Sequence, residues 1–243
     1  MPTFLIAVGL SLIGGLGGLL VASGVLLVKD STRSRLIPWL VSYAVGALLG
    51  VSMLALLPAT LEQLPPARAF ATLLWGILLF FVLEKLVLWR HCHTHDCEVH
   101  ESSVFPVVIG DAFHNFVDGA VIAAAVITSV PLGISTAFAV AAHEIPQEVG
   151  DFAILLHAGY SRGRALLLNV LSAGASALGA ISAFIALDIV PRLLPYCLAL
   201  AAASFLYVAM ADLIPGLHRG RTDAGSMRQI LLIGAGVGTM LVF

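Results

Sequence analysis

Long apolar runs follow one another along almost the whole chain, with short polar connections between them. A transmembrane helix needs about 20 consecutive, mostly apolar residues. By this criterion the sequence predicts eight spans, at residues 4–28, 37–57, 69–89, 104–127, 132–157, 165–187, 193–216 and 229–243. The first run is longer than the apolar region of a signal peptide, so we expect it to be a retained helix. The sequence therefore predicts an all-α integral membrane protein, with one transmembrane domain over residues 1–243.

The composition supports this class and excludes others. Apolar residues make up 60% of the chain and charged residues 11%, against roughly 45–50% and about 25% in ordinary soluble domains. A water-soluble globule and a disordered chain are both excluded by these values. The formal net charge of −2 gives no basic surface for nucleic acid, so the expected surroundings are the lipid bilayer and no nucleic-acid partner.

Basic residues are distributed unequally between the two ends of the predicted spans. Ten of the twelve Lys and Arg residues lie on one side, and the other side has Arg68 and Arg192. Connections rich in Lys and Arg stay in the cytoplasm. Both termini are therefore expected on the non-cytoplasmic side, with the plasma membrane (the bacterial inner membrane) as the expected location. A different number of spans would mix the two groups of charges, so this separation supports eight.

A weak internal repeat links the second and seventh predicted spans. Residues 53–59 read Met-Leu-Ala-Leu-Leu-Pro-Ala, and residues 210–216 read Met-Ala-Asp-Leu-Ile-Pro-Gly. Because these two spans cross the membrane in opposite directions, the repeat would have the inverted topology on which many transporters are built. A chance similarity between two apolar helices is an equally good explanation of the sequence alone.

Ionisable residues are concentrated in the fourth and fifth spans, although such residues are costly inside a membrane and usually mark a functional site. The fourth span contains DAFHNFVDG at residues 111–119, and the fifth contains HEIPQEVGD at residues 143–151. His114 and His143 each lie near the middle of their span. The two polar segments are therefore expected to meet at the same depth in the membrane.

The spacing of these residues predicts which of them share a helix face, because side chains four residues apart lie on one side of an α-helix. It pairs His114 with Asp118, His143 with Gln147, and Glu144 with Glu148. Imidazole, carboxylate and amide groups together suit a divalent transition metal, whose charge offsets the cost of burying carboxylates. Nitrogen and oxygen ligands without thiolates bind a metal ion less tightly, so the ion can exchange. A carrier requires such exchange. A proton relay or a polar helix–helix contact would use the same residue types.

Pro146 lies between the candidate ligands of the fifth span. Proline has no N–H group, so it cannot bond to the carbonyl oxygen of Ala142 four residues earlier. A freed carbonyl group is tolerated at membrane depth beside a cavity or a metal site. The sequence therefore predicts a kink at this cluster.

The two polar motifs resemble those of the ZIP (Zrt/Irt-like) family of metal transporters. Residues 114–119 match the family's HNFxDG pattern, and residues 143–151 are similar to the HExPHExGD pattern of its LIV-1 branch. The resemblance extends over the whole chain. It implies eight helices in a 3+2+3 inverted-repeat bundle, commonly a homodimer. It also implies uptake of zinc, and often iron, manganese or cadmium, into the cytoplasm.

The family pattern also implies a two-metal site between the fourth and fifth helices. The candidate metal ligands in this sequence are His114, Asn115, Asp118, His143, Glu144, Gln147 and Glu148. Gln147 departs from the pattern, which has His, or Glu in some bacterial members, at this position. Because an amide cannot bridge two cations as a carboxylate does, we expect one strong metal site and a second that is weaker or absent.

The connection at residues 91–103 is the one long polar connection and is expected in the cytoplasm. Its candidate metal-binding residues are His91, Cys92, His93, His95, Cys97 and His100. This composition favours metal capture, although the spacing fits no regular zinc module. We interpret the connection as a flexible acceptor for ions that leave the pore, with Asp111 and Asp151 as candidate relay residues before it. An incidental polar loop is the alternative.

Two other functions are compatible with a metal site inside a membrane. An intramembrane zinc-dependent hydrolase would also bind a metal there, although Gln147 replaces the second His of the HExxH motif of zinc proteases. An exporter would use the same site, because a binding site has no direction of its own. The function expected from the sequence is a divalent transition-metal transporter into the cytoplasm and not an enzyme, with the metal ion as transported substrate.

Overall fold

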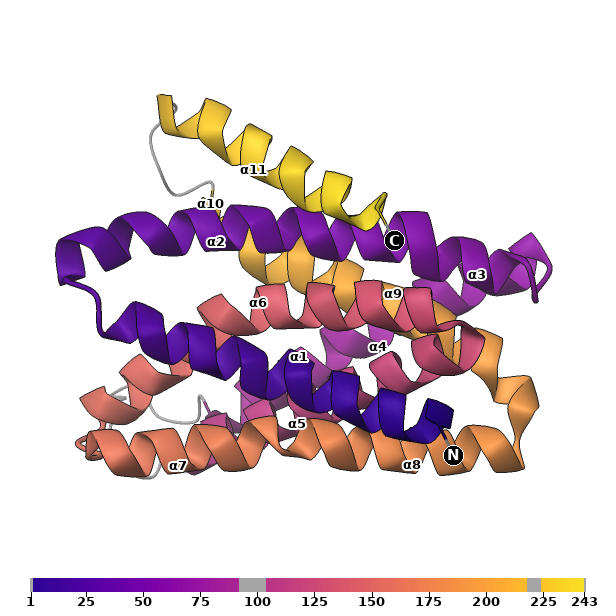
Figure 1. Ribbon diagram of the computed structural model, residues 1–243, viewed down its shortest axis with the longest axis horizontal. Coiled ribbons are helices and arrows are strands. Elements are labelled where there is room, and N and C mark those ends of the chain that lie inside the picture. Colours follow the sequence, from indigo (N-terminus) through magenta and orange to yellow (C-terminus); the bar gives the residue numbers. More distant parts are fainter. Residues whose placement is uncertain (1, 92–103, 218–223, 243) are drawn as a thin grey trace.

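The computed structural model describes residues 2–91, 104–217 and 224–242, and the regular elements in these ranges are all helices. In chain order they are α1 (Pro2–Leu26), α2 (Asp30–Val51), η1 (Ser52–Leu56), α3 (Leu57–Leu61), α4 (Pro66–His91), α5 (Val104–Thr128), α6 (Val130–His157), α7 (Arg162–Ala173), α8 (Ala175–Ile189), η3 (Pro191–Leu193), α9 (Leu194–Tyr207), η4 (Val208–Leu213), α10 (Ile214–Leu217) and α11 (Ala224–Met240). Several of these helices continue directly into the next. Each of the eight predicted spans therefore corresponds to one helical segment, and the all-α prediction is confirmed (Figure 1).

Six helical segments of the described chain are long and apolar enough to cross a membrane. The two other predicted spans are α6, whose apolar run is interrupted by the polar residues of the candidate site, and α11, which has 17 residues. Both nevertheless belong to the bundle, because α6 packs against α1, α2 and α5, and α11 packs against α2. The fold is that of an all-α membrane protein in which α6, the helix that carries half of the candidate site, packs against three other helices.

The connections between helices gather at two ends of the bundle (Figure 1). The α1–α2 connection and the beginning of α7 lie at one end, on the left in Figure 1. The N-terminus, α3 and the α8–α9 connection lie at the other end, toward which α11 also runs. Lys29 and Arg162 therefore lie at the same end, as the charge pattern predicts.

The internal repeat coincides with two π-helical segments, η1 and η4. At the end of η1 the N–H group of Leu57 bonds to the carbonyl oxygen of Ser52, five residues earlier. At the end of η4 the N–H group of Ile214 bonds to the carbonyl oxygen of Ala209, again five residues earlier. In both copies the next residue is the proline of the repeat, which has no N–H group to continue the regular pattern. The repeat is therefore a structural one.

The long helices pack with the same two-fold pattern. α1 packs on α6 as α8 packs on α5, and α2 packs on α11 as α9 packs on α4. The π segments follow it too, because η1 packs on α9 and η4 on α2. An inverted repeat matches the first three spans with the last three, and α5 with α6. Under this matching, each of these packed pairs corresponds to the other pair named with it. This is the packing that a 3+2+3 inverted-repeat bundle predicts.

Glycines allow α5 and α8 to approach each other closely. A Cβ atom on Gly119 would overlap with the backbone carbonyl group of Ser176, and one on Gly179 would overlap with that of Phe116. Glycines on α2 and α11 have the same relationship across that helix pair. Because α5 carries half of the candidate site, its close fit against α8 fixes the position of that half.

Candidate metal centre

The candidate site lies in the middle of α5 and α6, which are adjacent antiparallel helices. Ser129 alone separates them, and its hydroxyl oxygen accepts a hydrogen bond from the N–H group of Leu132 at 3.3 Å. A side chain that caps a helix in this way stabilises its first turn. The connection is too short for the helices to separate, so it brings His114 and His143 to the same depth.

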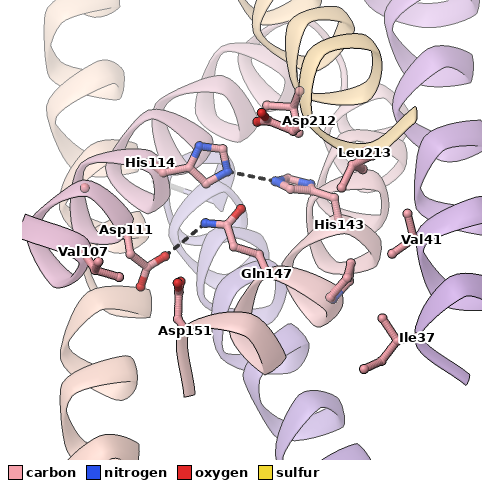
Figure 2. A pocket seen from close by; sticks show the side chains of 13 residues that line it. Ile37, Val41, Val107, Asp111, His114, His143, Gln147, Asp151, Asp212 and Leu213 are labelled. Atoms are coloured by element: carbon pink, nitrogen blue, oxygen red, sulfur yellow. Dashed lines mark hydrogen bonds between the residues drawn. The ribbon is translucent and has the colours of Figure 1, made fainter. Parts of the chain in front are cut away.

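Four side chains from these helices converge on one point. Nε2 of His114 lies 3.1 Å from Nε2 of His143 (Figure 2), and Nε2 of His143 lies 3.1 Å from Oδ2 of Asp118. Oε1 of Glu144 lies 3.6 Å from Nε2 of His143 and 3.7 Å from that of His114. One ligand atom from each residue lies within 4.8 Å of the others. Because zinc binds nitrogen and oxygen at about 2.0–2.2 Å, one ion could contact all four.

Burial makes this group costly without a cation. Asp118 and Glu144 are fully buried, whereas 23% of the His114 side chain is exposed. Neither carboxylate oxygen of Glu144 has a hydrogen-bond partner among the described residues. Nδ1 of His143 lies 3.1 Å from the carbonyl oxygen of Ala139, which places the ring proton there and leaves Nε2 as a ligand atom. A divalent cation would offset the buried negative charge.

A second group of carboxylates adjoins the first through Glu144. Asp111, Glu144 and Glu148 each place one oxygen atom within 4.8 Å of the others. The side-chain amides of Gln147 and Asn115 both donate to Oδ1 of Asp111, each at 3.1 Å. Their N–H groups therefore hold Asp111 in this structure, and the role of these two amides as ligands stays a prediction.

A cavity of about 650 Å³ reaches the site from one side. Its polar lining consists of Asp111, His114, His143, Gln147, Asp151 and Asp212 (Figure 2). Ile37 and Val41 also line it; Ile37 lies in the half of α2 that is nearer the α1–α2 connection, and Val41 lies at the middle of this helix. The cavity therefore extends from the site toward the end of the bundle that carries Lys29.

The opposite side of the site is packed with apolar side chains. The ring of Phe205, which is fully buried on α9, has its centroid 5.9 Å from that of His143. Ile122 of α5, Val140 of α6 and Leu198 of α9 are fully buried in the same hydrophobic core. The site thus lies between a polar cavity and a closed apolar layer.

Pro146 lies inside helix α6, between the candidate ligands His143 and Gln147. Helix α6 continues through Pro146, which lines the cavity. The carbonyl group that this proline leaves without its helical partner belongs to Ala142, which is buried inside the bundle. The kink itself stays a prediction.

Gly18 of α1 supports the second half of the site. A Cβ atom on Gly18 would lie 2.6 Å from Cβ of Glu144, closer than two carbon atoms can approach without movement. The adjacent Gly17 faces open space, because the nearest atom to its Cβ position is a methyl carbon of Ile13 at 4.0 Å. The position of Glu144 therefore depends on the absence of a side chain at residue 18.

Replacing Gly18 by alanine is expected to displace Glu144 and weaken zinc binding by about tenfold, with a stability cost of about 1–3 kcal/mol from overpacking. Isothermal titration of purified protein with zinc measures the affinity. Gly17→Ala, one residue away on the same helix, is the matched control and should bind zinc as the parent does. Equal affinities in the two variants would contradict a supporting role for Gly18.

The cavity also contains an acidic residue from outside α5 and α6, whereas some predicted residues lie outside the described ones. Asp212, which the sequence offers as a further candidate for the exit of the ion, lines the cavity. Its matching position in the first copy of the repeat is Ala55. Of the His- and Cys-rich connection, His91 ends α4. The other candidate residues, Cys92, His93, His95, Cys97 and His100, lie outside the described residues.

Fold and site together define a class: an α-helical membrane protein with buried His and carboxylate side chains grouped inside the bundle, as a divalent metal site would require. Residues 89–243 match the family model of the ZIP zinc transporters. The chain is 33% identical to zinc transporter ZIP13 of Pongo abelii over 219 residues, which cover 84% of this chain and 66% of that protein. It is 42% identical to human zinc transporter ZIP4 over 117 residues, which cover 48% of this chain and 18% of ZIP4. The chain belongs to the ZIP zinc transporter family.

A third relative is matched over most of its length. The chain is 28% identical to the zinc transporter ZIP13 homolog of Drosophila melanogaster, with 88% of this chain and 79% of that protein covered. By contrast, the chain spans about a fifth of human ZIP4. These relatives are named as transporters, so the comparisons favour a carrier over the intramembrane hydrolase considered from the sequence.

Proposed function

We propose that the protein carries divalent transition-metal ions, zinc above all, across the membrane through the site between α5 and α6. The observation that carries this proposal is the convergence of two imidazoles and two fully buried carboxylates within 4.8 Å. Imidazole nitrogen favours zinc and its neighbours over magnesium and calcium, and the carboxylates balance the charge of the ion. Since no thiolate takes part, the ion can leave again.

The position of the cavity supports a carrier that exposes its site to one side at a time. His114 and His143 both border the cavity, and His143 also contacts the packed layer at Phe205. Glycine-mediated close contacts join α1, α5, α6 and α8 in one group. They also pair α2 with α11 and α4 with α9, and these two pairs pack on each other through α9, α2 and η1 to make a second group. We propose that the two groups move relative to each other and open the site to the opposite side.

The direction of transport follows from the charge pattern. The cavity extends toward the end of the bundle that carries Lys29 and Arg162, which the positive-inside rule assigns to the cytoplasm. We therefore propose release into the cytoplasm, with both termini outside and the plasma or bacterial inner membrane as location. Asp151 and the connection at residues 91–103 would receive the ion. The family resemblance adds a homodimer to the proposal.

Zinc loading of proteoliposomes tests this function. Purified protein is reconstituted around a trapped fluorescent zinc indicator, and zinc is added outside. We expect saturable entry of zinc and no hydrolysis of lipid or peptide in the same vesicles. Cells that express the chain should also accumulate zinc from the medium, which tests the direction. Entry no faster than in protein-free liposomes would contradict transport, and turnover of a lipid or peptide would favour the hydrolase.

A further inference from the structure

Helices α2 and α11 begin at the same end of the bundle and run side by side in the same direction (Figure 1). A Cβ atom on Gly46 of α2 would overlap with the backbone of Ile233. A Cβ atom on Gly50, one turn later, would lie 3.2 Å from Cα of Val237, which is also one turn later. The two backbones are therefore in close contact, and the first turns of the two helices lie near each other.

An arginine and a tryptophan meet near this end of the helix pair. Cζ of Arg228 on α11 lies 4.7 Å from the centroid of the Trp39 ring on α2. The Arg228 side chain is exposed and Trp39 is 38% exposed, so the pair is on the surface of the bundle. A guanidinium group over an aromatic face is attracted by the ring and held in orientation. The N–H groups at the edge of the guanidinium group stay available to an anion.

A second arginine lies one helical turn from Trp39. Arg35 precedes Trp39 by four residues, so the two share a face of α2, and the Arg35 side chain is exposed. No ion pair of Arg35 or Arg228 with a carboxylate is found among the residues that the structure describes. Asp30 is the one acidic residue in the sequence of α2 and α11. The two helices therefore provide little negative charge to balance these arginines.

The position of this surface agrees with the expected boundary of the membrane. Trp39 is the third residue of the predicted span at 37–57, and Arg228 directly precedes the predicted span at 229–243. Tryptophan is enriched at the level of the lipid headgroups. Leu231, which shares a face of α11 with Arg228, is 66% exposed. The arginines are therefore level with headgroups, and Leu231 is level with the beginning of the acyl chains.

We propose that Arg35, Trp39 and Arg228 form a binding site for the headgroup of an anionic phospholipid, whose acyl chain passes along α11 at Leu231. A guanidinium group can donate two parallel hydrogen bonds to phosphate oxygens. A zwitterionic lipid offers the same phosphate, but the two arginines repel its ammonium group. In the proposed orientation the site faces the cytoplasmic leaflet, where anionic lipids give the surface a negative potential. The binding itself does not depend on metal transport.

Native mass spectrometry of the full chain tests this site. Protein purified in detergent is mixed with phosphatidylglycerol or with phosphatidylcholine of the same acyl chains, and the bound lipids are counted. We expect phosphatidylglycerol to bind at least about fivefold more tightly, which is the contribution of one basic residue at a membrane surface. Soluble glycerol phosphate has the headgroup without the acyl chains and should not displace the lipid. Its displacement of the lipid at equal concentration would indicate a free-phosphate site and contradict the proposal.

Variants assign the lipid to its ligands. Arg228→Gln and Arg35→Gln should each weaken phosphatidylglycerol binding by about fivefold and leave phosphatidylcholine binding unchanged. Arg68→Gln is the matched control, because Arg68 is exposed near the beginning of α4, at the other end of the bundle (Figure 1). An unfolding midpoint like that of the parent shows that each variant is folded. An equal loss of binding in Arg68→Gln would mean that the lipid responds to net charge alone, and would overturn the site.

Fluorescence quenching then locates the bound lipid. The chain has three tryptophans, so the double variant Trp75→Phe/Trp89→Phe keeps Trp39 alone. In bilayers that contain a minor fraction of lipid brominated on its acyl chains, brominated phosphatidylglycerol should quench Trp39 more than brominated phosphatidylcholine does. Adding Arg228→Gln should remove this difference. Equal quenching by the two lipids, or a difference that persists in Arg228→Gln, would contradict the proposed site.

Discussion

Zinc uptake falls by at least about 100-fold when His143 is replaced by alanine, because a ligand is worth more than the 10- to 100-fold of an outer contact. Its Nε2 atom lies 3.1 Å from both Nε2 of His114 and Oδ2 of Asp118. Without the imidazole of His143, the site keeps the two buried carboxylates and has a single nitrogen ligand for zinc. His114→Ala should have the same effect. Initial rates of radiolabelled zinc uptake, with the parent beside both variants, measure it.

His157→Ala is the matched control for this loss. His157 ends the same helix α6, and its side chain is exposed. The substitution removes an imidazole of the same kind without touching the cluster, so uptake should stay near that of the parent. Unchanged uptake in both His114→Ala and His143→Ala would remove the proposed site from the transport pathway.

The second large effect is on stability. Gly119→Ala would place a methyl group on the backbone carbonyl of Ser176, and backbone cannot move aside as a flexible side chain can. Overpacking costs typically about 1–3 kcal/mol, and we expect this variant to reach or exceed the upper end. The midpoint of thermal unfolding in detergent should fall by many degrees, and the yield of monodisperse protein should fall with it.

Gly110→Ala on the same helix separates crowding from helix propensity. A Cβ atom at Gly110 meets nothing within 4 Å. Alanine favours the helix over glycine by up to about 1 kcal/mol, so this variant should be as stable as the parent or slightly more stable. Similar unfolding midpoints for the two variants would show that α5 and α8 are not held as closely as the structure indicates.

Most of the fold could be predicted from apolar run length, because a bilayer requires helices of one length. The predicted spans at 104–127 and 132–157 match α5 and α6 within two residues at each end. The predicted span at 229–243 differs from the observed helix, because α11 begins five residues earlier, at Ala224. Hydropathy assigns this polar segment to a connection. The π segments were not predicted, although Pro58 in an apolar run was a signal for one of them.

The site could be predicted in part. The depth of His114 and His143 in their spans correctly placed them together, because a short connection fixes the relative depth of two helices. Spacing alone could not show that the amide of Gln147 would hydrogen-bond to Asp111 on the neighbouring helix. The spacing of residues indicates which of them share a face of one helix. Which residue of the neighbouring helix they contact depends on how far each helix is rotated about its axis. The four-residue spacing of Asp111 and Asn115 could have indicated their contact.

The paired π segments place matching positions of the repeat in opposite halves of the bundle, Ala55 in η1 and Asp212 in η4. A carrier with full two-fold symmetry would present the same electrostatic landscape to ions arriving from either face. The carboxylate at position 212, which borders the cavity, breaks this equivalence. In a carrier, net flow still follows the gradient, but such a difference makes the half-saturation concentrations for the ion on the two faces unequal.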